Sequence, residues 1–325
     1  MERVVSIQKT WSWKQFLLQW ECLLFLILIL VHIINSFASP FYFNTHTFFS
    51  APRGFLDRAF IVFPMMLVIM LGKIDISVGS IVAFTAVMMA VLFNAGLPMP
   101  LAIVAALVIG TLCGGINGLL MVKFPELPAM IITLSTMVIF RGVAFVILRD
   151  QASGGFPAWF SFFAWGYVGP FPFIMVTFVI AACVFALVIH KTAFGRAVYG
   201  MGSNFLACRY SGVKTDRVIM TVGLLTGLMS AICAIFLASR MGSTRPNVAI
   251  GYELDVIAMV VLGGVSTSGG TGRIAGPILA VFIIGFLGFG LGLRNVSAQI
   301  ALIILGLLLI SSVLFMNIRS RKKKA

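Results

Sequence analysis

Apolar runs of nearly 20 residues recur from about residue 21 to about residue 316, and they limit what the chain can fold into. About 20 apolar residues form an α-helix long enough to cross a hydrocarbon core of about 30 Å. Of the 325 residues, 61% are apolar and 10% are charged, against about 45–50% and about 25% in soluble domains. A soluble protein could not bury this much apolar surface, so the sequence predicts an all-α, polytopic membrane protein.

Turn-forming residues and polar breaks divide the apolar sequence into about ten predicted transmembrane helices. Their expected boundaries are about 21–39, 57–72, 78–94, 101–122, 128–148, 172–190, 218–239, 254–264, 274–293 and 297–316. Residues 21–318 therefore form a single predicted transmembrane domain. A basic, tryptophan-containing lead at 1–20 precedes this domain, and a basic tail at 319–325 follows it.

The distribution of the 23 Lys and Arg residues predicts the orientation of the chain. Cytoplasmic loops of membrane proteins collect Lys and Arg, and most of these residues fall in cytoplasmic segments if the N-terminus is inside. We therefore expect both termini and loop 191–217 in the cytoplasm, and loops 149–171 and 240–253 outside. The net charge of +14 reflects this orientation rather than nucleic-acid binding, because no basic soluble surface carries it.

The chain lacks the residue patterns of metal sites, nucleotide sites and enzymes. Its five Cys and three His residues are scattered, without a CxxC or HExxH motif, so neither a metal site nor a cofactor is expected. Residues 263–273 are rich in glycine but lack the Lys-Ser/Thr of a phosphate-binding loop. No nucleophile or acid/base pair is clustered. We therefore expect no enzymatic activity and no ATP binding by this chain.

The polar break at 72–80, with the sequence GKIDISVGS, separates two apolar runs. A carboxylate such as Asp75 is costly in a membrane unless it is paired, hydrated or facing a cavity. The break is therefore either a broken helix that lines a pathway or gate, or a short cytoplasmic turn in which Lys73 and Asp75 are solvated. Residues 71–77 also resemble residues 262–268, which indicates either an internal repeat or a chance similarity of glycine-rich segments.

Several polar side chains within or beside the apolar runs are candidates for a solute pathway or gate. Arg141 must face the interior of the bundle or reach the membrane interface; it either hydrogen-bonds a polyhydroxylated solute or braces another helix. Neutral polar groups in such positions also serve as interhelical contacts. The candidates are Asp75, Ser77, Asn117, Thr133 and Arg141.

Loop 191–217 is predicted to contain a short helix that docks on a soluble partner. Ser203 is expected to cap a helix over 204–210, and Gly212 lies just past its end.

Three segments resemble the permeases of monosaccharide ABC importers. Residues 72–80 are similar to the signature G-x-I-D-[IL]-S-V-G-S, and residues 251–264 form a second match. Loop 191–217 is similar to the stretch G-R-x-x-Y-x-x-G-x-N-x-x-A-x-x-S-G of the same family. The matching residues, which the resemblance assigns to ATPase coupling, are Gly195, Arg196, Tyr199, Gly202, Asn204, Ala207, Ser211 and Gly212.

Within this family the chain looks most like rhamnose-type permeases, through residues 140–142, 150–155, 239–246 and 289–293. Permeases for autoinducer-2, ribose and xylose are similar as well, so these substrates are the alternatives. Lys73 departs from the signature, which usually has glycine or another uncharged or acidic residue there. It could pair with Asp75.

The resemblance implies a permease subunit in the bacterial inner membrane that works by ATP-driven alternating access. Its implied partners are a cytoplasmic ATP-binding subunit, a periplasmic sugar-binding protein and a second permease chain, identical or related. Outer residues Arg245, Glu253 and Asp255 are assigned to binding-protein docking. An ion-coupled secondary transporter is less well supported, since it would need carboxylates or histidines in its spans and Asp75 is nearly alone there.

Overall fold

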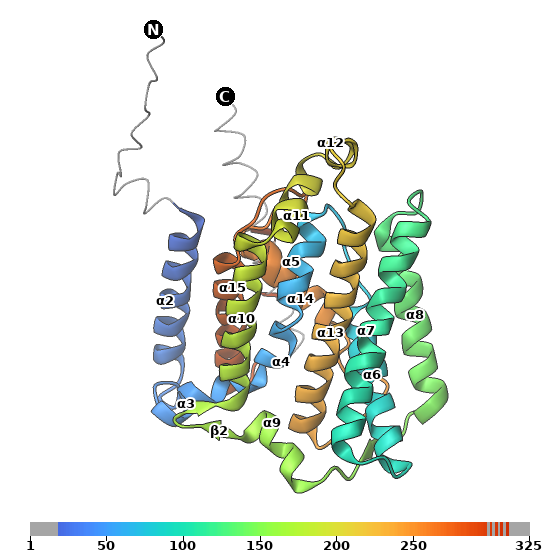
Figure 1. Ribbon diagram of the computed structural model, residues 1–325. Helices are drawn as coiled ribbons and strands as arrows, with labels where there is room; N and C mark the ends of the chain where they lie inside the picture. Colours follow the sequence, from blue (N-terminus) through green and yellow to red (C-terminus); the bar gives the residue numbers. More distant parts are fainter. Residues whose placement is uncertain (1–18, 298–299, 301–302, 305, 308–309, 312–325) are drawn as a thin grey trace.

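The computed structural model describes residues 19–297, 300, 303–304, 306–307 and 310–311. Within this described part, six helices are long and apolar enough to cross a membrane (Figure 1). They are α2 (Trp20–Ala38), α7 (Met99–Lys123), α8 (Ala129–Leu148), α10 (Phe173–Lys191), α13 (Thr215–Met241) and α15 (Ala275–Leu293). The predicted class, a helical membrane protein with many spans, is confirmed.

Three further apolar helices are shorter than a full span: α5 (Val62–Met70), α6 (Val78–Asn94) and α14 (Tyr252–Leu262). The nine residues of α5 rise about 14 Å at 1.5 Å per residue, less than half of a hydrocarbon core. The expected spans 57–72 and 254–264 are therefore half-helices, and the count of ten spans is not confirmed. The lead at 1–18 and the tail at 319–325 lie outside the described residues, as does most of the expected span 297–316.

Short elements gather at the two opposite ends of the bundle (Figure 1). Two helices cross one end, here called the α12 end: α11 (Ala193–Ser203) and α12 (Phe205–Tyr210). The other end, here called the α9 end, carries α3 (Thr45–Ser50), η1 (Ala51–Gly54), η2 (Ala158–Ser161), α9 (Phe162–Trp165), β2 (Tyr167–Val168) and β3 (Phe171–Pro172). The short helix α4 (Leu56–Ala59) leads from the α9 end toward α5.

Two small antiparallel strand pairs order the loops outside the helices. Strand β1 (Ser153–Gly154) pairs with β4 (Ser243–Thr244), with Ser153 opposite Thr244. Strand β2 pairs with β3 in a tight hairpin. The β1–β4 pair links the loop after α8 to the loop after α13, which are the two segments that the sequence places outside the membrane.

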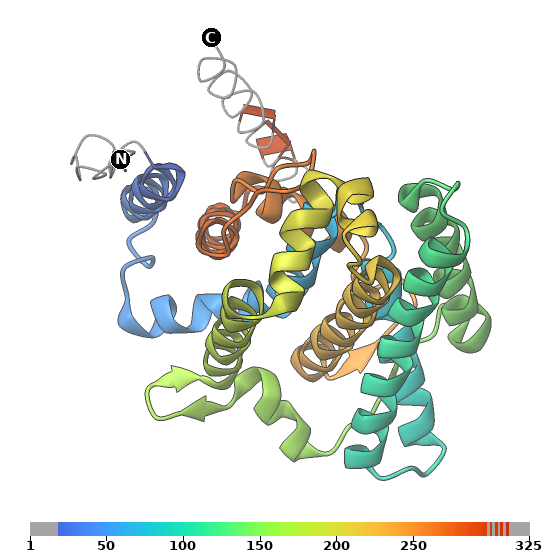
Figure 2. The ribbon, with the colours of Figure 1, turned by 45° about the horizontal axis from the view of Figure 1, so that its top comes forward.

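Helices α7 and α13 lie side by side (Figure 2), and glycines on both sides of their contact let them pack backbone against backbone. A Cβ at Gly227 of α13 would collide with the carbonyl oxygen of Gly110 and lie 2.8 Å from the backbone nitrogen of Gly114. A Cβ at Gly114 would likewise collide with the carbonyl oxygen of Gly223. Helices in membranes associate largely through such close packing of small residues, so this contact holds α7 against α13.

Helix α5 is buried along its whole length. Phe63 of α5 stacks on Phe185 of α10, with ring centroids 5.2 Å apart. One turn before α5, Phe60 stacks on Phe236 of α13 at 5.1 Å. A helix that is apolar on all faces is expected in the interior of a large bundle, and α5 occupies that place.

The two half-helices α5 and α14 end in the same kind of turn. After α5, the amide of Lys73 donates to the carbonyl of Val68, and Gly72 has a φ of 69°. After α14, the amide of Val265 donates to the carbonyl of Val260, and Gly264 has a φ of 86°. Both are Schellman turns with a left-handed glycine. The similarity between 71–77 and 262–268 is thus structural, although Gly72 corresponds to Gly264 and not to Gly263.

Replacing Gly227 with Ala should destabilise the protein, because the added methyl group meets only backbone atoms of α7. Overpacking of this kind typically costs about 1–3 kcal/mol. The measurement is the thermal unfolding midpoint of the purified protein in detergent. Gly288→Ala in α15 is the matched control, since nothing lies within 4 Å of a Cβ there. Equal midpoints for the two variants would contradict the packing argument.

Candidate functional site

Asp75 lies at the centre of a buried polar cluster in the break between α5 and α6. Its side chain is 2% exposed, so the alternative of a solvated turn does not describe it. Its Oδ1 atom accepts hydrogen bonds from the Ser77 backbone amide at 2.8 Å and from the Ser77 hydroxyl at 2.6 Å. Lys73 makes no ion pair with Asp75 in the structure, and the cluster therefore rests on neutral donors.

Asn117 and Thr133 tie the break to the two neighbouring helices. The Asn117 side-chain amide, from α7, donates to the Ser77 hydroxyl at 2.7 Å. The Thr133 hydroxyl, from α8, accepts from the Ile76 amide at 3.3 Å. The structure thus brings together four of the five pathway candidates, Asp75, Ser77, Asn117 and Thr133, around one interruption of helical structure. The buried Oδ1 atom of Asn117 has no hydrogen-bond partner among the described residues.

The backbones of three chain segments are in direct contact at the α12 end. The Gly270 amide, in the connection from α14 to α15, donates to the carbonyl of Met70 at the end of α5 at 2.9 Å. Gly202, near the end of α11, lies against both groups, since a Cβ there would collide with the Met70 oxygen and the Gly270 nitrogen. We call Met70, Gly202 and Gly270 the backbone junction. Through it, α11 contacts the end of α5 and the connection that follows α14. The segments that follow these two half-helices are here called the two breaks.

Tyr199 makes a second link between α11 and the α14–α15 connection. Its hydroxyl donates to the carbonyl of Gly272 at 2.6 Å. Partial burial raises the pKa of this hydroxyl, while the nearby Arg273 opposes the shift. The group therefore stays protonated at neutral pH and remains a donor.

The other residues of the coupling segment shape its turns. A Cβ at Gly195 would collide with the carbonyl of Ile189, so the turn from α10 into α11 requires glycine. The expected Ser203 cap is wrong: Asn204 caps α12, accepting from the Ala207 amide at 2.9 Å, because Ser203 is still part of α11. Gly212, with a φ of 83°, follows the end of α12 as expected. Arg196 and Ser211 are exposed.

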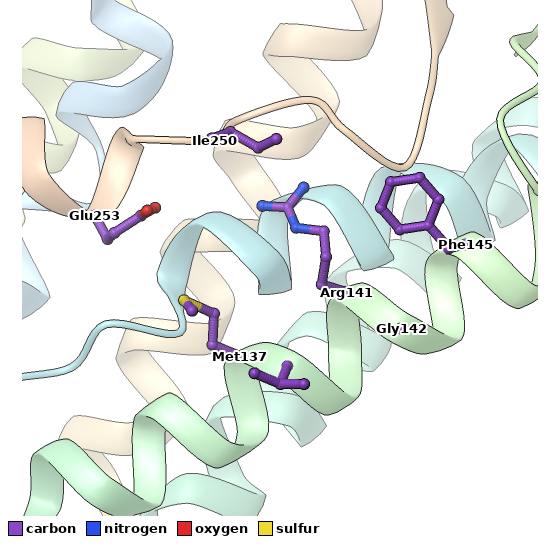
Figure 3. A pocket seen from close by; sticks show the side chains of 7 residues that line it. Met137, Arg141, Gly142, Phe145, Ile250 and Glu253 are labelled. Atoms are coloured by element: carbon purple, nitrogen blue, oxygen red, sulfur yellow. The ribbon is translucent and has the colours of Figure 1, made fainter.

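Arg141, the fifth pathway candidate, lies apart from the Asp75 cluster in a pocket of about 360 Å³ (Figure 3). Its Nη1 atom donates to the carbonyls of Pro246 at 2.7 Å and Val248 at 2.6 Å. This is the bracing role that the sequence allowed. The rest of the guanidinium group faces the pocket and bonds to no described residue. The pocket is lined by Met137, Val138, Arg141, Gly142, Phe145, Ile250 and Glu253.

Glu253, which the sequence assigned to binding-protein docking, projects into the same pocket (Figure 3). Its Oε1 atom accepts from the Gly251 amide at 3.2 Å. Its carboxylate lies so close to the start of α6 that a Cβ at Gly79 would collide with Oε2. The sequence did not predict that Arg141 and Glu253 line one pocket, because 111 residues separate them and no motif joins them.

The two other docking candidates have different surroundings. Arg245 is exposed. Asp255 is 9% exposed and forms an ion pair with Arg58. A second pair joins Arg240 to the buried Asp57 at 2.7 Å, and the Tyr252 hydroxyl also donates to Asp57 at 3.2 Å. Sequence reasoning missed this charge network, although consecutive charges at Asp57 and Arg58 in an apolar run signal it.

Comparison with known proteins gives consistent matches over nearly the whole chain. Residues 55–313 match the family described as "Branched-chain amino acid transport system / permease component". The ribose import permease protein RbsC of Bacillus subtilis is 38% identical over 305 residues, covering 93% of this chain and 92% of that protein. The autoinducer 2 import system permease protein LsrD of Salmonella paratyphi B is 34% identical over 306 residues, covering 92% and 91%. No solved structure matches the chain.

Long apolar helices, half-helices and a helix pair across one end define a multi-pass membrane protein, and the matches identify it as a transport protein. The chain belongs to the permease-component family named above, and its resemblance to monosaccharide ABC importer permeases is confirmed. It is a translocation subunit of the bacterial inner membrane and not an enzyme.

Gly202→Ala should lower ATP-driven uptake, because the new methyl group forces the backbone junction apart. Overpacking typically costs about 1–3 kcal/mol, and about 1.4 kcal/mol corresponds to a tenfold change in an equilibrium constant. We therefore expect uptake to fall about tenfold. The measurement is solute uptake by the reconstituted complex, alongside its basal ATP hydrolysis. The matched control is Gly200→Ala in the same helix, where a Cβ meets only the flexible Cys208 sulfur. Equal uptake by both variants would show that the junction plays no part in transport.

Proposed function

We propose that this permease carries a small sugar across the inner membrane as one of two permease chains of an ABC importer, with D-ribose or a similar pentose as the favoured substrate. The observation that carries the mechanism is the backbone junction. It connects α11, at one end of the bundle, to both breaks. Energy delivered at α11 and α12 thereby acts on the half-helices around the polar cluster.

In this proposal the α12 end faces the cytoplasm. Lys191, Arg196, Arg209, Lys214 and Arg217 lie in or beside α11 and α12, and Lys and Arg are enriched on the cytoplasmic side of membrane proteins. Lys123, at the end of α7, belongs to the same end (Figure 1). Both chain termini are assigned to this side on the same argument.

The cytoplasmic ATP-binding subunit docks on α11 and α12. The short α12 has no buried residue in this chain, and Tyr210 is 88% exposed, which fits a surface that a partner covers. The proposed contact and coupling residues are Gly195, Arg196, Tyr199, Gly202, Asn204, Ala207, Ser211 and Gly212. Of these, Tyr199 and Gly202 act inward on the breaks, and Arg196 and Ser211 are exposed toward the partner.

The periplasmic sugar-binding protein docks on the α9 end. The β1–β4 pair joins two outer loops there into one surface, and Arg245 lies exposed just beyond β4. The burial of Asp255 with Arg58 gives Asp255 a role in holding α14 in place rather than in direct contact. Glu253 belongs to the pocket.

A second permease chain covers part of the apolar surface, and lipid covers the rest. Large apolar side chains are exposed along α7, α8 and α10, for example Leu112 at 59%, Val146 at 81% and Leu187 at 60%. A membrane protein exposes such residues to lipid or to another helix. The pathway candidates Asp75, Ser77, Asn117, Thr133 and Arg141 all lie on or beside α6, α7 and α8, which therefore face the pathway in this proposal.

The relatives favour ribose or autoinducer-2 over rhamnose. One relative imports ribose and another imports autoinducer-2 by name, and the sequence-based preference for rhamnose has no support among them. Both solutes are small and rich in hydroxyl groups, so the polar lining of the breaks suits either. Family membership also leaves no need for the ion-coupled alternative.

Reconstitution tests the proposal. Proteoliposomes containing this chain, the cognate ATP-binding subunit and the cognate binding protein should accumulate labelled D-ribose only when ATP is supplied and both partners are present. Omitting either partner should reduce uptake to the background of empty liposomes. Uptake of autoinducer-2 but not ribose would select the second candidate. Uptake driven by an ion gradient without the ATP-binding subunit would contradict the proposal.

A further inference from the structure

Arg141 and Glu253 present opposite charges to one pocket and do not form an ion pair with each other (Figure 3). We propose that this pocket is a solute-binding subsite within the permease, which takes a neutral polyol through two neighbouring hydroxyl groups. The inference rests on the proposed function, since the solute is the sugar that the importer carries. It adds that the permease itself selects the solute and does not leave selection to the binding protein alone.

The pocket has the size of a small-molecule site. Its volume of about 360 Å³ lies at the lower end of the roughly 300–1,000 Å³ typical of ligand pockets, which suits a monosaccharide. One face of α8 forms a wall, because Met137, Arg141 and Phe145 are spaced four residues apart and so lie in a row on a helix. Ile250 and Glu253 come from the opposite side (Figure 3).

Each charged group has bonding capacity left for a solute. The Arg141 Nη1 atom is used by the carbonyls of Pro246 and Val248, and its other N–H groups bond to no described residue. Glu253 uses Oε1 for the Gly251 amide, and Oε2 accepts from no described donor. A hydroxyl group can donate to a carboxylate and also accept from a guanidinium group. Two neighbouring hydroxyls of a sugar can therefore bond to both residues at once.

The charge balance of the pocket favours a neutral solute. An anion would be attracted by Arg141 but repelled by Glu253, and a cation would meet the reverse. A neutral polyol satisfies both groups and leaves neither charge unpaired in a membrane protein, where an unpaired charge is costly. The aromatic ring of Phe145 and the side chain of Met137 supply apolar contact for the C–H groups of a sugar ring.

The protein holds both groups in place before a solute arrives. Two backbone carbonyls fix the direction of Arg141. Glu253 lies against the first turn of α6 at Gly79, where the partial positive charge of a helix N-terminus stabilises a carboxylate. Preorganised polar groups lose little free energy to ordering on binding. The contact with α6 also joins the pocket to the helix that begins at the Asp75 cluster.

The test compares D-ribose with 2-deoxy-D-ribose in the reconstituted importer, using the same binding protein for every permease variant. The contribution of the binding protein to the ratio of the two uptake rates then cancels between variants. Glu253→Gln keeps the shape of the side chain and its acceptor for Gly251. It should lower ribose uptake about tenfold or more, the loss expected from one hydrogen bond to a charged group, and should bring the ratio closer to one. Glu126→Gln, at an exposed loop position, is the control and should change neither value.

The outcomes separate the subsite from the proposed function. If the wild-type complex transports ribose and Glu253→Gln leaves rate and ratio unchanged, the subsite is overturned and the proposed function stands. If the wild-type complex with both partners transports no small sugar, the proposed function fails and takes the subsite with it.

A second variant covers the case in which Glu253→Gln does not fold. Ile250→Trp adds bulk at the pocket, where the native side chain is 68% exposed. Leu254→Trp adds the same bulk at a side chain 66% exposed that does not line the pocket. Ile250→Trp should slow ribose uptake at least about tenfold relative to Leu254→Trp, which corresponds to about 1.4 kcal/mol. Equal rates for the two tryptophan variants would overturn the subsite.

Discussion

Direct contact between backbones, with no side chain in between, limits how the parts of this permease can move relative to each other. At the α12 end, the Met70 carbonyl and the Gly270 amide form a hydrogen bond of 2.9 Å, and Gly202 of α11 packs directly against both. Side chains can change rotamer to absorb a displacement, but backbone atoms in contact cannot. In the proposed mechanism, a displacement of α11 is therefore transmitted to the end of α5 and to the α14–α15 connection. The glycines that line α7 and α13 make the same kind of direct backbone contact between two long helices.

The breaks suit this proposed transmission because they interrupt the helices while their backbone amides keep hydrogen-bond partners. A helix interrupted inside a membrane exposes amide and carbonyl groups that must find partners. Around the break, Asp75 accepts from the Ser77 amide and Thr133 accepts from the Ile76 amide, while Asn117 donates to the Ser77 hydroxyl. The start of α6 then contacts Glu253 in the outer pocket. A continuous path of contacts thus runs from α11 through the breaks to the proposed solute site, and an alternating-access cycle requires two such packed arrangements.

Much of this arrangement was predictable from the sequence, and the parts that were not have separate physical causes. Apolar run lengths predicted the long helices, and the 72–80 motif identified the break but left open whether Asp75 is buried or solvated. Apolarity did not distinguish a half-helix from a span, because α5 and α14 are as apolar as the full spans, although the expected run 254–264, at 11 residues, is too short to cross a membrane. The cap of α12 was misplaced by one residue because Ser203 and Asn204 are both good caps. The spacing of four between Gly110, Gly114 and Gly118, and between Gly223 and Gly227, could have predicted the α7–α13 contact. The placement of Arg141 and Glu253 in one pocket depends on tertiary packing, and no local sequence pattern encodes it.

If α11 and the two breaks move together, as proposed, the distance between them within one chain stays constant through the transport cycle. Spin labels at Ala193 in α11 and at Thr267 in the α14–α15 connection occupy exposed positions, once the five native cysteines are replaced. Labelled chain is diluted into unlabelled chain so that distances within one copy dominate. A further label pair, Ala193 with Val146 on α8, reports whether the complex changes conformation between the two nucleotide states. Ala193 and Thr267 should therefore show one unchanged distance distribution in the nucleotide-free and ATP-trapped complexes. A shift of that distribution, in a complex whose second pair also shifts, would contradict it.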